Sequence, residues 1–162
     1  MDTGEGTAQM ESTDTVETLE AHTCWSLMRS VPIGRLAVIV DGHPEIFPIN
    51  VVVDRGSVVF RTGEGTKAQA AMSDAPVAIE ADGFDPETGR AWSVVVKGRA
   101  HTITDVEAVI DSADLPLEPW QAGRKDRFIR VRADEVTGRR FPVADASVWR
   151  TPASGGTRAA ME

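Results

Sequence analysis

Short runs in which hydrophobic and polar residues alternate fill the middle of the chain, and turn residues separate them. Because successive side chains of a strand point to opposite faces, such runs predict strands. The predicted strands cover residues 34–40, 45–53, 57–61, 76–81, 91–103 and 127–136. Asp41-Gly42 predicts a hairpin between the first two strands. Gly98, inside the fifth, predicts a bulge or a close approach of another backbone.

Three stretches have the spacing or the composition of helices. Apolar residues from Thr15 to Val31 fit a period of 3.6 residues, and Pro32 ends that run. Good helix formers extend from about Gly65 to Ser73. Thr104 opens a third, short helix as its N-cap. Cys24 lies within the first helix, and we interpret it as a small packing residue rather than a reactive thiol.

Closely spaced short strands with few helices predict a mainly β fold, a small six-stranded barrel. Closure of the barrel removes exposed sheet edges. Side chains fill a barrel of this size, so a ligand with a large flat ring must lie on its outside. We assign the barrel domain to residues 16–150. Residues 1–15 are predicted to be a disordered acidic tail, and residues 151–162 a flexible C-terminal tail.

Composition and charge narrow the functions open to such a barrel. The 162 residues carry a net charge of −8, which argues against binding to nucleic acid or to an anionic membrane. No apolar run approaches the roughly 20 residues needed to span a bilayer. A single cysteine excludes an intrachain disulfide and favours a cytoplasmic location. The three histidines are scattered, so no metal site is expected.

The junction between the third strand and the helix after it is the strongest candidate for chemistry. Arg61, Thr62, Gly65, Thr66 and Lys67 gather there. A helix N-terminus offers unpaired N–H groups and a partial positive charge, and glycine lets a ligand approach the backbone. Together with the hydroxyls and the two cations, these groups favour a phosphate. The alternative interpretation is a capped helix start with two solvated cations.

Two further segments, one before this junction and one after it, matter for the function, because the order of all three along the chain resembles that of a known family. They are Pro48-Ile49-Asn50-Val51 upstream and the strand from Trp92 to Ala100 downstream. With them, residues 20–142 resemble the pyridoxamine 5'-phosphate oxidase-like family of flavin-binding split β-barrels, and most closely its nitroimidazole-reductase-like and actinobacterial branch. The resemblance implies a homodimer that holds FMN in the clefts between its subunits.

The resemblance also implies which residues meet the cofactor. Arg61, Thr62, Thr66 and Lys67 would bind the phosphate, although Thr66 stands where the oxidases have an arginine. The flavin ring would lie along the second and fifth strands, with Trp120 reaching it from the neighbouring subunit. The ring-binding candidates are Pro48, Ile49, Asn50, Val51, Trp92 and Ser93. The alternative role of Asn50 is that of an ordinary strand asparagine bonded to a turn. The alternative role of Trp92 is that of a core aromatic.

These features predict an FMN-dependent oxidoreductase that transfers hydride between flavin N5 and a small substrate. The flavin does the redox chemistry, so no catalytic triad is needed, and no catalytic residue is assigned. Two alternatives stay open: a reductase that uses the deazaflavin F420 in the same groove, and a non-catalytic module that binds flavin, haem or a lipid-like ligand. The sequence leaves the substrate and the electron donor undetermined.

Overall fold

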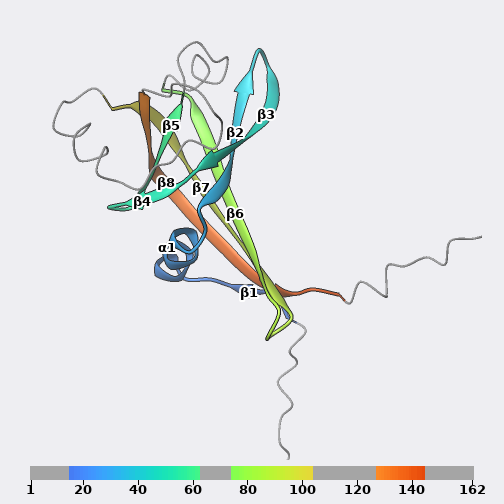
Figure 1. Cartoon of the computed structure of the whole chain (residues 1–162). Coiled ribbons are helices and arrows are strands. Elements are labelled where there is room, and N and C mark those ends of the chain that lie inside the picture. The colour runs from blue at the N-terminus through green and yellow to red at the C-terminus, as the bar shows by residue number, and fades with distance from the viewer. Residues whose placement is uncertain (1–14, 63–73, 104–126, 145–162) are drawn as a thin grey trace, which may run out of the picture.

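The computed structural model describes residues 15–62, 74–103 and 127–144, which form one helix and eight strands (Figure 1). The elements in chain order are β1 Glu17–Thr18, α1 Ala21–Arg29, β2 Ile33–Val40, β3 His43–Asn50, β4 Val52–Asp54, β5 Ser57–Thr62, β6 Pro76–Asp85, β7 Arg90–Thr102 and β8 Arg127–Pro142. Outside the described residues lie the predicted helices at 65–73 and from 104, Trp120, and both predicted tails except for Thr15.

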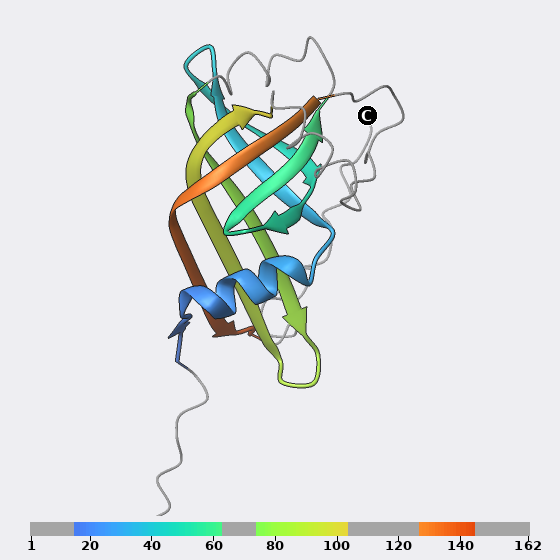
Figure 2. The same ribbon diagram turned by 90° about the vertical axis from the view of Figure 1, so that its left-hand side faces the viewer.

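All the strands belong to one antiparallel sheet, which curls into a barrel. Its order is β3-β2-β6-β7-β8-β5-β4, with β1 pairing to β8. The two ends of this order, β3 and β4, follow each other in the chain with only Val51 between them, and β3 also contacts β5. The sheet therefore turns back on itself, as Figure 2 shows, and the predicted mainly β barrel is confirmed.

Two predicted backbone features are confirmed. Asp41 and Gly42 both have positive φ, 50° and 79°, as the tight turn between β2 and β3 requires. The pairing of β7 with β8 shifts register between Lys97 and Gly98, which is a bulge. A Cβ atom on Gly98 would overlap the carbonyl oxygen of Arg132, so only glycine fits there.

Three element boundaries differ from the prediction. The predicted second strand is two strands, because the N–H of Val51 donates to the carbonyl of Pro32 instead of joining a ladder. The predicted first helix begins at Ala21 and not at Thr15, because Glu17 and Thr18 pair with the far end of β8. Strands β6 and β8 run further than predicted, to Asp85 and Pro142, since each has a partner along that length.

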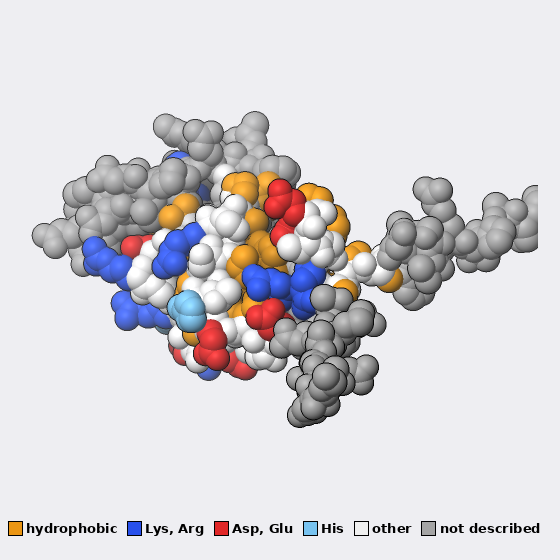
Figure 3. Space-filling model, turned by 90° about the horizontal axis from the view of Figure 1, so that it is seen from below, with side chains coloured by type: hydrophobic (Ala, Val, Ile, Leu, Met, Phe, Trp, Pro, Cys, Tyr) orange, Lys and Arg blue, Asp and Glu red, His pale blue; other side chains and the backbone are white. Residues whose placement is uncertain are grey.

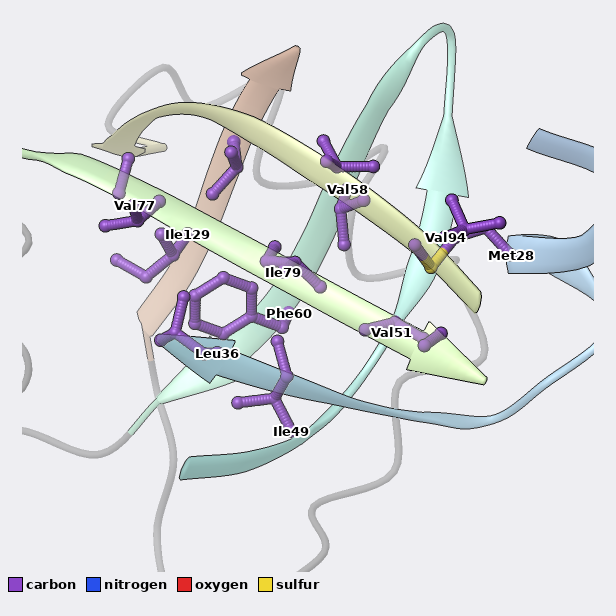
Figure 4. Packing of buried hydrophobic residues seen from close by; sticks show 14 of the residues in the cluster. Met28, Leu36, Ile49, Val51, Val58, Phe60, Val77, Ile79, Val94 and Ile129 are labelled. Atoms are coloured by element: carbon purple, nitrogen blue, oxygen red, sulfur yellow. The ribbon is translucent and has the colours of Figure 1, made fainter. Parts of the chain in front are cut away.

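Alternate side chains of the strands fill the barrel, and α1 lies across the barrel near one end (Figure 2). The interior centres on Phe60, Leu36 and Ile79, packed among valines from β5, β7 and β8 (Figure 4). The helix adds Met28 and Cys24, both fully buried. Burial raises the pKa of the Cys24 thiol, so the packing role predicted for this residue is confirmed. No helix in the described ranges is long and apolar enough to cross a membrane.

Candidate functional site

The strand end that leads into the predicted phosphate junction is well defined. Arg61 and Thr62 close β5, paired with Phe128 and Arg127 of β8, and both are half-buried. The guanidinium carbon of Arg61 lies 5.3 Å from the centre of the Phe128 ring, a cation–π distance that fixes the direction of the side chain. Gly65, Thr66 and Lys67 lie outside the described residues, so their role stays a prediction.

A second apolar cluster lies beside Arg61, on the outer side of the barrel wall. Val59 and Phe128 are buried there, with Val52 and Ile103 packed against them. Their neighbours Val58 and Ile129 point the other way, into the main core. The outer side of the barrel wall near the strand end therefore carries a buried apolar cluster next to a cation.

A polar network fixes this part of the wall. Arg130 of β8 donates to Asp54 Oδ2 at 2.8 Å and to Ser57 Oγ at 2.6 Å, and Ser57 Oγ in turn donates to the Asp54 carbonyl at 2.6 Å. The network ties the turn between β4 and β5 to the neighbouring strand. Since Ser57 opens β5, it also sets the position of the strand that carries Arg61.

The predicted ring-binding stretch divides between the two sides of the wall. Ile49 and Val51 are buried in the core, so they would meet a ligand through their backbone only. Pro48 is exposed and Asn50 half-buried, on alternate positions that face outward. The ladder of β4 with β5 ends at the pair of Val52 with Val59, so Asn50 and Arg61 each lie two residues beyond that last pair, and β3 contacts β5. Asn50 therefore belongs to a strand that contacts the one whose end is predicted to bind phosphate.

Trp92 and Ser93 lie elsewhere. The Trp92 indole is buried against Gly83, where a Cβ atom would overlap it, so Trp92 is a core aromatic. Ser93 faces outward and pairs with Arg139, eleven residues along β8 from Phe128, the partner of Arg61. That separation is about 36 Å of strand. Within one chain, Ser93 and Arg61 are not brought together.

A charged cluster that the sequence analysis missed lies between Pro48 and Ser93. Arg35 contacts Glu80 at 3.1 Å and Asp82 at 3.5 Å, and it pairs with Pro48 while Asp82 pairs with Ser93. Burial, with a smaller contribution from the charge of Asp82, raises the pKa of Glu80. Strand alternation marks these residues as outward-facing, but no sequence signal gives the register that joins them.

The comparisons with known proteins agree with this architecture. The family model described as pyridoxamine 5'-phosphate oxidase matches residues 20–140. The chain is 34% identical over 157 residues to the uncharacterized protein Rv0080 of Mycobacterium tuberculosis, covering 94% of this chain and all of that protein.

Two solved structures share the fold over most of the chain. One is an FAD binding protein from Mycobacterium smegmatis, 39% identical with a TM-score of 0.68, covering 78% of this chain and 98% of that one. The other is a conserved Corynebacterium diphtheriae protein of unknown function, 33% identical with a TM-score of 0.66, covering 79% and 99%.

Proposed function

Because this chain belongs to the pyridoxamine 5'-phosphate oxidase family, we propose that it binds a flavin nucleotide and acts as an oxidoreductase on a small substrate. The observation that carries the proposal is the position of Arg61. This cation lies beside Thr62 at the end of β5, a strand that β3 contacts, on the outside of a barrel whose interior is filled. The flavin reported for the M. smegmatis relative supports the choice of ligand.

The described residues fit a flavin nucleotide at both of its ends. A phosphate needs cations and hydroxyl donors, which Arg61 and Thr62 supply, with Lys67 as the further cation predicted from the sequence. A flavin ring needs apolar cover and hydrogen-bond partners at its edge. Pro48 and the outward amide of Asn50 supply these on the neighbouring strand. When bound, the flavin would supply hydride transfer at N5, and the chain would orient the ring and the substrate.

We propose a homodimer with the flavin at the subunit interface. The wide separation of Ser93 from Arg61 supports this arrangement, because both are predicted to meet one flavin and a single chain holds them apart. A second subunit would bring its own Ser93 or Trp120 to the Arg61 of the first. The free, buried Cys24 is consistent with the cytoplasmic location we propose.

FMN is the flavin predicted from the sequence, and the M. smegmatis relative makes FAD the second candidate. To test the proposal, the protein is purified without added flavin, dialysed until no bound ligand absorbs, and titrated separately with FMN and with FAD while the flavin fluorescence is followed. We expect quenching to saturate at one flavin per chain, and anaerobic NAD(P)H to bleach the bound flavin. No saturable binding of either flavin would refute the proposal, whereas binding without reduction would point to the non-catalytic alternative.

A further inference from the structure

An exposed apolar patch lies on the outer side of the β2–β3 hairpin. The Ile39 and Ile46 side chains are 57% and 67% exposed, and they face away from the core, which the alternate residues of β2 fill. Ile39 pairs with Pro44 and Ile46 pairs with Ala37, so the two isoleucines are diagonal neighbours across the hairpin. Contiguous exposed apolar surface marks an interaction site more often than isolated residues do.

A second apolar patch lies at the other end of the same side of the sheet. Phe84 of β6 is 57% exposed, and it shares a row with Ala91 of β7 and Phe141 of β8. Ala37 pairs with Ala78 of β6, so the first patch lies about 20 Å from Phe84 along that strand. Figure 3 looks onto the end of the molecule that carries the hairpin between β6 and β7, and hydrophobic side chains are visible there among charged ones. This side of the barrel therefore carries an apolar patch at each end.

The charged cluster described above lies between the two patches. Arg35 contacts Glu80 and Asp82, and the side chains of Arg35 and Asp82 are both more than half exposed. Because the cluster holds one cation and two carboxylates, it can form ion pairs with an identical cluster. We call the outward side chains of β2, β3 and β6, from Ile39 and Ile46 through this cluster to Phe84, the β6 face.

The outer edge of β3 is poorly suited to strand pairing. In the part of the chain that the structure describes, β2 is the only strand that pairs with β3. Pro44 and Pro48 lie within that ladder and have no N–H. They lie on the same side of the strand, and the ladder with β2 is continuous, so the missing donors belong to the edge away from β2. A partner would therefore meet this region through the β6 face rather than by adding a strand.

We propose that two copies of this chain pack against each other through the β6 face. The proposal rests on the flavin-binding homodimer proposed above and names the surface on which that dimer forms. Pro48 pairs with Arg35 and Ser93 pairs with Asp82, so two of the predicted ring-binding residues lie on the margins of this face. Packing there would bring residues of both copies to one flavin, as the proposed site requires. It would also remove both apolar patches from water.

Sedimentation velocity of the full-length protein over a range of concentrations tests the proposal. The variants are Ile46→Arg and Phe84→Arg, one in each patch. The matched control is Val16→Arg, because Val16 is 61% exposed but lies just before β1, outside the β6 face. All three side chains are exposed, so the substitutions do not touch the core. We expect each variant in the face to raise the dissociation constant of the dimer at least tenfold, and the control to sediment as the wild type does.

Cross-linking with a short bismaleimide gives a second readout. The only native cysteine, Cys24, is buried, so an engineered thiol on the surface is the reactive one. If the two copies pack with their β6 strands parallel, Ile46→Cys and Phe84→Cys should each link two subunits. If the strands are antiparallel, only the variant that carries both cysteines should do so. Val16→Cys should give no cross-link.

Three results would overturn this interface: a wild type that stays monomeric, a dimer that both arginine variants leave intact, and no cross-link from any cysteine variant in the face. Failure of the proposed flavin function looks different. In that case the wild type binds neither flavin, while the arginine variants still dissociate the dimer. Conversely, a dimer that binds flavin and resists both arginine variants would leave the flavin function standing and place the interface elsewhere.

Discussion

Replacing Asp54 by asparagine should destabilise the protein far more than removing a carboxylate from an exposed ion pair in the same sheet. Asp54 receives a 2.8 Å hydrogen bond from Arg130, and the two side chains are only 25% and 19% exposed. The variant Asp54→Asn leaves the half-buried guanidinium without its counter-charge. Breaking a fully buried pair costs about 3–5 kcal/mol, and an exposed one about 0–1 kcal/mol. For this intermediate burial we expect a loss of about 2 kcal/mol.

The matched control is Glu135→Gln. Glu135 contacts Lys97 at 3.2 Å, but these side chains are 54% and 56% exposed, so the loss should stay below about 0.5 kcal/mol. Urea denaturation followed by tryptophan fluorescence measures both variants, with an unchanged m-value showing that the unfolding transition is the same. The 2 kcal/mol loss corresponds to a melting temperature lower by roughly 6 °C.

A double-mutant cycle then separates the pair from other effects. If Asp54 and Arg130 stabilise the fold through each other, Asp54→Asn combined with Arg130→Gln should cost at least about 1 kcal/mol less than the sum of the two single losses. A loss for the double variant equal to the sum of the two single losses would refute this reasoning. Equal losses for Asp54→Asn and Glu135→Gln would refute it as well, because burial would then not decide the strength of the pair.

Three other predictions concern the bulge, the charged cluster and the phosphate junction. Gly98→Ala should cost about 3 kcal/mol in urea denaturation, because the new methyl group overlaps the Arg132 carbonyl and the bulge must shift; a loss below 1 kcal/mol would contradict this. Because the pKa of Glu80 is raised above its ordinary 4.5, its contribution to stability is present below that pH and is lost as the pH rises through the folded-state pKa. The stability of the wild type relative to Glu80→Gln, measured by urea denaturation at a series of pH values, should therefore fall as the pH rises above 4.5. A stability difference that does not change with pH would contradict this prediction. Lys67→Ala should lower flavin affinity at least tenfold, about 1.4 kcal/mol, by fluorescence titration; unchanged affinity would remove Lys67 from the site.

Local sequence signals predicted most of the sheet. Alternation placed β2 to within one residue, and Asp41-Gly42 and Gly98 marked a turn and a bulge that are both present. The pairing of β1 with β8 had no such signal. Two residues are too few to show a period, and their partners Arg140 and Arg139 lie 123 and 121 residues away.

The candidate site was also predictable only in part, because sequence signals are local and do not show which distant residues meet. Arg61 and Thr62 follow from one continuous stretch of sequence, whereas the Arg130 network joins residues 76 positions apart. The distance between Ser93 and Arg61 depends on the order of the strands, which alternation does not contain. The sequence therefore predicts the residue types and the side of the sheet that each strand residue faces. It does not predict which of these residues lie close together on the surface.

The position of β8 in the sheet has a consequence for how the protein is made. It is the last of the described strands in chain order, yet it lies between β7 and β5. A nascent chain that stops before residue 127 holds two separate ladders, β3-β2-β6-β7 and β5-β4, with their edges open. Open edges are the sites at which unfinished chains pair with one another. The barrel can close only after β8 has been synthesised, so a chain truncated before residue 127 should give an aggregating product rather than a smaller domain.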